Sequence, residues 1–75
     1  MEKLVEYIVS QLVEHPEDVK ITSHPDGNAI IIKVETHPDD LGRVIGKNGR
    51  IASSIRTIVK NAGIKSHKKY IVKIG

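Results

Sequence analysis

The sequence contains no cysteine, and no apolar run in it approaches the ~20 residues that a membrane-spanning helix needs. Disulfides and zinc–thiolate sites are therefore excluded, which agrees with a reducing compartment. The N-terminal stretch MEKLVEYIV carries two glutamates and has no cleavage-site pattern of a signal peptide. We therefore expect a cytoplasmic protein without a membrane partner. Its 75 residues suffice for one small domain, residues 1–75.

Acidic residues are absent from residues 41–75, which hold nine lysines and arginines. Residues 1–40 show the opposite balance, with three lysines against nine carboxylates, so the net charge of +3 combines halves of −6 and +9. Such an asymmetry indicates an anionic partner for the second half of the chain. A solvated basic face that keeps the protein soluble explains the charge equally well. Charge alone therefore does not decide between the two interpretations.

Apolar periodicity predicts the first three elements. Residues 2–14 place apolar side chains at helical spacing, and His15-Pro16 ends this amphipathic helix. Residues 19–22 alternate as a half-buried strand does, and residues 29–36 form the strongest strand pattern in the chain. Between them, PDGN at residues 25–28 predicts a turn, because proline presets one dihedral angle and glycine or asparagine accepts a positive one. The two strands therefore form a hairpin.

Two helices and a last strand follow. Pro38-Asp39-Asp40 predicts the start of a short helix, which Gly46 ends. A second helix is expected from residue 50 to residue 62 with Gly63 as its cap, and the last strand runs from about residue 69 to residue 74. The order is helix, strand, strand, helix, helix, strand, which is an α+β class. A last strand parallel to its neighbour would be connected through the two-helix unit.

Two glycines three positions apart interrupt the helical pattern in GKNG, residues 46–49. Because a helix begins directly after them, free backbone N–H groups and the helix dipole point out of the loop. Lys47 and Arg50 add positive charge, so a phosphate would meet donors and no obstructing side chain. A helix cap at Gly46 and a turn residue at Gly49 would need no ligand, and GXXG alone is a weak signal. Nucleotide hydrolysis is disfavoured, because neither a Walker A loop nor a GxGxxG fingerprint is present.

The stretch IGKNGRI, residues 45–51, with Ile55 one turn later, resembles the signature of KH domains. These are small modules that bind RNA or single-stranded DNA around a GXXG loop between two helices. The element order resembles the type II, bacterial-style KH arrangement over essentially all 75 residues, and the chain is most similar to short bacterial proteins with a single KH domain. The resemblance implies a type II KH fold, a three-stranded sheet with three helices packed on one face.

The resemblance also implies a groove for about four nucleotides. Its borders would be the GXXG loop, the flanking helices and a sheet edge beside a variable loop at residues 24–28. Glycines let a sugar–phosphate backbone approach, and the polar and cationic side chains around them donate to it. The apolar members of the site either form a floor under the bases or belong to the core, and its serines either bond a base edge or face solvent. The expected RNA-binding residues are Arg43, Val44, Ile45, Gly46, Lys47, Asn48, Gly49, Arg50, Ile51, Ser53 and Ser54, with Arg56 and Lys60 broadening the field.

Phenylalanine and tryptophan are absent and tyrosine occurs twice, which excludes the aromatic stacking platform of RRM and OB-fold proteins. KH grooves do not depend on such stacking, but one module of this kind binds weakly, and pairing of domains would raise its affinity. The four histidines are scattered without an HExxH motif or a neighbouring nucleophile. We therefore predict no enzymatic activity, no cofactor and no metal site.

The predicted function is single-stranded RNA binding, or single-stranded DNA binding, by an RNA chaperone or post-transcriptional regulator. One alternative, which the resemblance implies, is a KH-fold protein-interaction module that pairs with itself or with a larger multidomain KH-containing partner. A ribosome assembly factor would use the same chemistry. The lysine within GKNG favours RNA binding, because a purely structural loop has no need of it.

Overall fold

The computed structural model describes all 75 residues and has the expected α+β class and element order. None of its helices has the length and apolar character required to span a bilayer. Three single-turn 3₁₀ helices supplement the main elements. The main elements are α1 (Glu2–Ser10), β1 (Lys20–Asp26), β2 (Ala29–Glu35), α2 (Leu41–Ile45), α3 (Arg50–Lys65) and β3 (Lys69–Ile74), and the 3₁₀ helices are η1 (Pro16–Asp18), η2 (Pro38–Asp40) and η3 (Lys47–Gly49).

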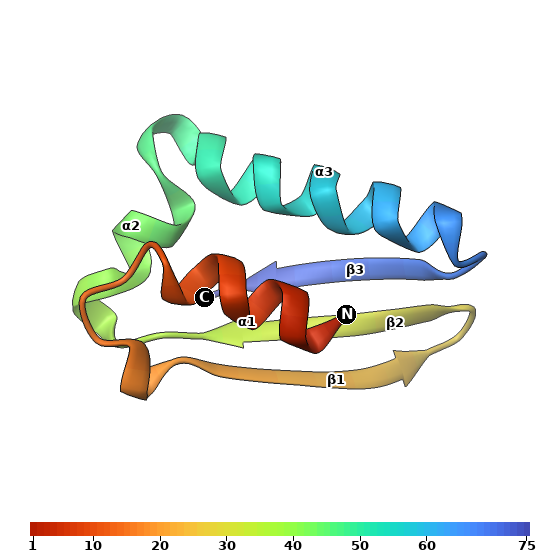
Figure 1. Ribbon diagram of the computed structural model, residues 1–75, viewed down its shortest axis with the longest axis horizontal. Helices are drawn as coiled ribbons and strands as arrows, with labels where there is room; N and C mark the ends of the chain where they lie inside the picture. The colour runs from red at the N-terminus through yellow and green to blue at the C-terminus, as the bar shows by residue number, and fades with distance from the viewer.

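The three strands form one mixed sheet in the order β1-β2-β3. β1 pairs antiparallel with β2 across the two-residue turn Gly27-Asn28, and β2 pairs parallel with β3. A parallel pair requires a long crossover, which α2 and α3 supply. In Figure 1, α3 runs along β3 and α1 lies in front of the sheet, so the helices cover one face, as predicted.

The core lies between this face and the helices, and aliphatic side chains fill it. Ile32 and Val34 of the central strand are fully buried, whereas Lys33 between them is exposed on the opposite face. Burial of each such side chain contributes about 1.5–3 kcal/mol relative to exposure. The core is small, consistent with the length of the chain. Its members are Val5, Val9, Ile32, Val34, Val44, Ile55, Val59 and Val72.

α1 ends at Ser10, four residues before the end that the apolar spacing predicts. The cause is tertiary: the backbone N–H groups of Glu14 and His15 donate to the carboxylate of Asp40, at 3.1 and 2.9 Å. Donors used in this way are not available to continue the helical ladder. Leu12 and Val13 remain partly buried after the helix ends, which explains why the apolar period continues past it.

Pro25, expected in a turn, and Gly63, expected to cap a helix, have other roles. Pro25 is paired with Ile30 within β1, not in a turn. Because β1 is an edge strand, it tolerates a residue that has no backbone N–H. Gly63 lies inside α3, which continues to Lys65, and does not cap it. A Cβ atom at Gly63 would lie 2.7 Å from the backbone oxygen of Lys68 and 2.8 Å from the ring of Tyr70, so the glycine permits β3 to begin close to α3.

Candidate nucleic-acid interface

The loop between α2 and α3 is a tight turn whose backbone repeatedly adopts positive φ. α2 ends at Gly46, with φ of 78°, and Asn48 and Gly49 follow with φ of 58° and 73°. Glycine adopts this region without strain and asparagine tolerates it better than most residues. The sequence GKNG therefore fits the backbone that it forms, and α3 begins at the next residue, Arg50.

The two glycines of the loop differ in what surrounds them. A Cβ atom at Gly46 would lie 2.6 Å from Cγ1 of Ile51, so contact within the chain already requires a glycine there. At Gly49, by contrast, no atom lies within 4 Å of such a Cβ position. The open space that a sugar–phosphate backbone could approach is therefore on the Gly49 side of the loop.

The polar side chains of the loop are free. Lys47, Asn48 and Arg50 are exposed, and none of them takes part in an ion pair. No side chain caps the N-terminus of the 16-residue helix α3, which leaves the N–H groups of its first turn without a side-chain acceptor. A helix N-terminus without a side-chain cap, the helix dipole and two cations meet at one point, and this combination favours an anion.

The other expected site residues differ in burial, from exposed to fully buried. Ser53 and Ser54 are exposed on α3, and Oγ of Ser54 donates to the backbone oxygen of Arg50. Ile45 and Ile51 are partly buried, whereas Val44 is fully buried in the core. The sequence left open whether these apolar residues lie under the bases or in the core, and Val44 belongs to the core.

Arg43 points away from the loop and into a network of its own. Its guanidinium lies 2.9 Å from the carboxylate of Glu14 and also donates to the backbone oxygen of Asp39, at 3.0 Å. A third contact, at 3.4 Å, reaches the carboxylate of Asp40. These contacts tie α2 to the connection after α1, so in this conformation Arg43 has a structural role.

Asp40 is the only charged side chain of the chain that is fully buried. Burial alone would raise its pKa, but the backbone N–H groups of Glu14 and His15 and the nearby charges of His15 and Arg43 outweigh that effect. The pKa of this carboxyl is therefore lowered, and Asp40 is ionised at neutral pH. The anion fixes the start of α2, the helix that leads into the GXXG loop.

A groove of about 440 Å³ lies between α3, from Arg56 onward, and the first part of β3. Within it, Nε of Arg56 on α3 donates to the backbone oxygen of Val72 on β3, at 3.3 Å. Cationic and apolar side chains alternate around it, a combination suited to phosphates and bases. The lining residues are Arg56, Lys60, Ile64, Lys68, Lys69, Tyr70, Ile71 and Val72.

Sequence reasoning found this groove only in part. It placed Arg56 and Lys60 at the margin of the site and did not include Lys68, Lys69 or Tyr70. The basic stretch KSHKK, residues 65–69, was the available signal, because it leads directly into an edge strand. The expected variable loop, residues 24–28, forms the end of the hairpin at the far end of the sheet from the GXXG loop (Figure 1), and it does not line the groove, although Ala29 beside it pairs with Lys69, which does.

Comparison with known proteins adds a third line of evidence. The family model described as "KhpA/KhpB, KH domain" matches residues 2–74. The chain is 49% identical to RNA-binding protein KhpA of Clostridium perfringens over 74 residues, which cover 99% of both chains. It is 47% identical to RNA-binding protein KhpA of Listeria monocytogenes (99% of this chain and 97% of the relative), and 42% identical to that of Bacillus subtilis (92% and 85%). No solved structure matches.

Proposed function

The chain belongs to the KhpA/KhpB family of KH domains, a non-enzymatic RNA-binding family, and from this premise we propose that it binds single-stranded RNA with its GXXG loop and the groove between α3 and β3. The loop holds the sugar–phosphate backbone, and the groove receives the unpaired bases. The observation that carries the proposal is the coincidence, at Gly49, of open space with the uncapped N-terminus of α3 and three free polar side chains.

The residues of the loop have distinct roles in this proposal. Lys47 and Arg50 supply charge-assisted hydrogen bonds to phosphate, which are about twice as strong as neutral ones. Asn48 adds a neutral donor, and Gly49 allows the strand to approach the first turn of α3. Gly46, packed on Ile51, keeps the loop in the required backbone conformation.

The groove contributes a second set of contacts. Arg56 and Lys60 line the groove from α3, and Lys68 lines it from the residue before β3, so these cations neutralise phosphates of a strand that extends from the loop along α3. The ring of Tyr70 is the only aromatic surface available to a base in the groove. A single module of this size binds weakly, and this suits a cytoplasmic RNA chaperone or post-transcriptional regulator that exchanges between transcripts.

Exposed isoleucines on α3 favour a second candidate function, the pairing of KH domains. Ile58 and Ile64 are 46% and 61% exposed, although both are large apolar side chains. Pairing with a second copy or with a larger KH-containing protein through Ile58, which does not line the groove, would leave the groove open and join two RNA sites, raising the effective concentration of each, whereas pairing through Ile64 would compete with RNA. The mass of the chain in solution, measured by light scattering across a concentration series, tests pairing with itself.

The RNA-binding proposal is tested with labelled single-stranded RNA by fluorescence anisotropy, with the matching duplex as competitor. Single strands should compete far better than duplex, because bases must enter the groove unpaired. The slope of log affinity against log salt should be about −0.7 for each phosphate neutralised, or about −2 for three contacts. Equal competition by duplex, or an affinity that does not change with salt, would contradict the groove. Single-stranded DNA in the same assay shows whether the 2′-hydroxyl is recognised.

A further inference from the structure

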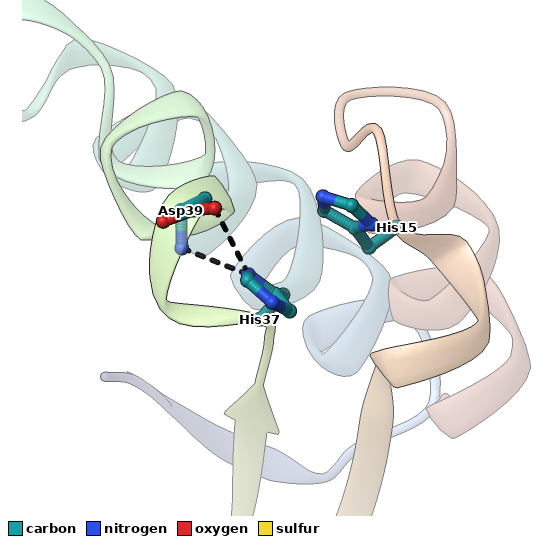
Figure 2. A group of neighbouring side chains, drawn as sticks. All are labelled: His15, His37 and Asp39. Carbon is teal, nitrogen blue, oxygen red and sulfur yellow. Dashed lines mark hydrogen bonds and ion pairs between the residues drawn. The ribbon is translucent and has the colours of Figure 1, made fainter.

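Two histidines that are far apart in the sequence stack on each other away from the GXXG loop. His15 lies in the connection between α1 and β1, and His37 in the connection between β2 and α2. Their ring centroids are 4.3 Å apart and the rings are inclined by 30°. One carboxylate oxygen of Asp39 lies 3.7 Å from Nδ1 of His37. Figure 2 shows the two rings facing each other, with Asp39 beside His37.

One potential ligand atom from each of these three residues lies within 4.8 Å of the other two. Two imidazoles and a carboxylate are the donor set that zinc and its neighbours in the transition series prefer, whereas calcium and magnesium prefer oxygen alone. The chain has no cysteine, so no thiolate site competes for such an ion. We propose that His15, His37 and Asp39 bind a divalent transition-metal ion.

The backbone around this site is already held in place. Asp40 accepts the backbone N–H of His15 at 2.9 Å, so the residue that follows Asp39 fixes the position of the first histidine. The backbone N–H of Asp39 donates to Nδ1 of His37, at 3.1 Å. Nδ1 of His37 therefore carries a lone pair, which is the state that a metal ion requires of a neutral imidazole.

The ligand atoms need a small rearrangement to bind one ion. Ligand distances of about 2.0–2.2 Å place tetrahedral ligand atoms about 3.3 Å apart, which is close to the 3.7 Å between His37 and Asp39. A single ion cannot lie in the planes of two stacked rings, so at least one ring turns on binding. The side chains of His15 and His37 are 39% and 33% exposed, which leaves room for that rotation. Water then replaces the ring as acceptor of the exposed N–H of Asp39.

The local charge favours a cation. The segments 14–18 and 37–43 hold five carboxylates and one guanidinium, that of Arg43. Arg43 is already paired with Glu14 and Asp40, so its charge is compensated. The carboxylate of Glu17 lies 3.5 Å from Nδ1 of His15. It either completes the ligand set or orients that ring from outside it, as the partners of metal-bound histidines do.

The proposed ion would connect two segments whose contact exists only in the folded chain. Because metal binding to such a site favours the folded state, the free energy of unfolding rises with the concentration of the ion. The clamped segment includes η2, directly before α2, which leads to the GXXG loop. Metal binding would stabilise this segment whether or not the chain binds RNA.

The test uses the full chain without a histidine tag. Zn²⁺ is titrated by calorimetry, and Co²⁺ by its visible absorption, which reports the coordination geometry. We expect saturation at one ion per chain and a melting temperature that rises with Zn²⁺. The variants His15→Ala, His37→Ala and Asp39→Asn should each weaken binding at least about tenfold. The matched controls are the other two histidines, His24→Ala and His67→Asn, the latter because His67 has φ of 58° and asparagine tolerates that conformation.

The outcomes separate clearly. Loss of binding in the His15, His37 and Asp39 variants, with both controls unchanged, supports the site. The proposal is overturned if neither ion saturates, or if the double variant His15→Ala/His37→Ala binds as tightly as the parent. Circular dichroism checks that each variant is folded. If the histidine variants do not fold, the metal affinity of Asp39→Asn decides whether the site exists. The side chain of Asp39 is 77% exposed, so its replacement leaves the core intact.

Discussion

The buried carboxylate of Asp40 accepts the backbone N–H of His15 at 2.9 Å, across 25 positions of the chain. The same carboxylate accepts the N–H of Glu14 at 3.1 Å. Together these bonds end the helical run of the N-terminal segment and hold it against the start of α2. The position of the loop after α2 therefore depends on a carboxylate that does not itself belong to the interface.

Asp40 should make the fold sensitive to acid. Its pKa is lower in the folded chain than in the unfolded chain, so the folded chain binds this proton less tightly. The stabilisation is complete at neutral pH, begins to decline near the unfolded pKa of about 3.9 and is lost as the pH falls through the folded pKa. We expect melting temperatures measured between pH 7 and pH 3 to fall more steeply for the parent than for Asp40→Asn, whose amide does not titrate.

Asp40→Asn should also melt at a lower temperature than the parent at pH 7, because its amide NH₂ group replaces one of the two carboxylate oxygens and would face the N–H donor of either Glu14 or His15. The matched control is Asp39→Asn, one residue earlier and exposed, which should change stability much less. Parallel curves for the parent and Asp40→Asn would show that another group causes the acid sensitivity.

The element order and the parallel crossover were predictable because they follow from local periodicity. The strands at residues 29–35 and 69–74 are short runs rich in isoleucine and valine, and a parallel pair leaves few connections. The early end of α1 was not predictable, because its cause, Asp40, lies 25 positions away. The prediction that Gly63 caps α3 was wrong for a similar reason. A glycine near a helix end is typical of a cap, but here a Cβ atom would collide with the neighbouring strand.

The candidate site was predictable where a short motif encodes it and not where tertiary structure builds it. GKNG specifies both a backbone conformation and a chemistry, so the loop could be identified from four residues. The role of Arg43 depends on Glu14, and the groove depends on how α3 lies along β3. The stacked histidines, 22 positions apart, follow no metal-ligand spacing, and only the fold brings them together.

The two glycines of the loop should differ in what their replacement costs. Gly49→Ala meets no neighbouring atom and suffers only from positive φ, which costs about 1–2 kcal/mol. Gly46→Ala has a larger conformational penalty, because its φ of 78° and ψ of 172° lie in a region that essentially only glycine adopts, and it also collides with Ile51 at 2.6 Å, so its loss of stability should be clearly larger. Urea denaturation of both variants measures the difference.

Ile51→Ala tests the contribution of packing to that difference, because it removes Cγ1 and Cδ1, two of the three atoms that the new methyl group would meet, and leaves only Cβ, at 2.9 Å. In a double-mutant cycle, Gly46→Ala should cost less stability in the Ile51→Ala background than in the parent. Equal costs for Gly46→Ala in the parent and in the Ile51→Ala background would mean that the packing of Ile51 against the loop adjusts freely.

The lysines of the groove should contribute to RNA binding through charge. Lys60→Ala and Lys68→Ala each remove a cation from the groove wall. We expect each to weaken binding to all sequences alike and to reduce the magnitude of the salt slope by about 0.7 if the lysine neutralises one phosphate. Lys33→Ala is the matched control, because Lys33 lies on the helix-free face of the sheet and pairs with Glu35. A salt slope unchanged in both groove variants would restrict the interface to the loop.

Two charge changes in the loop test the interface most directly. Lys47→Asp combined with Asn48→Asp places two carboxylates where a phosphate is expected. Both positions are exposed, and aspartate, like asparagine, tolerates the φ of 58° at position 48. The free energy of unfolding should therefore change by no more than about 0.5 kcal/mol. RNA binding should weaken by about 2 kcal/mol or more, roughly thirtyfold, because the lysine contact is lost and like charges repel.

The control for this variant is Lys3→Asp, which makes a similar change of charge on α1, away from the loop, and should have a much smaller effect. Anisotropy titrations of the parent and both variants at one salt concentration give the comparison, with circular dichroism as the check of folding. A folded double variant that binds RNA as tightly as the parent would show that GKNG is only a connection between helices. The exposed isoleucines of α3 would then make domain pairing the better explanation of this chain. A folded double variant that loses RNA while its oligomeric state is unchanged would assign RNA binding to the loop, independently of pairing.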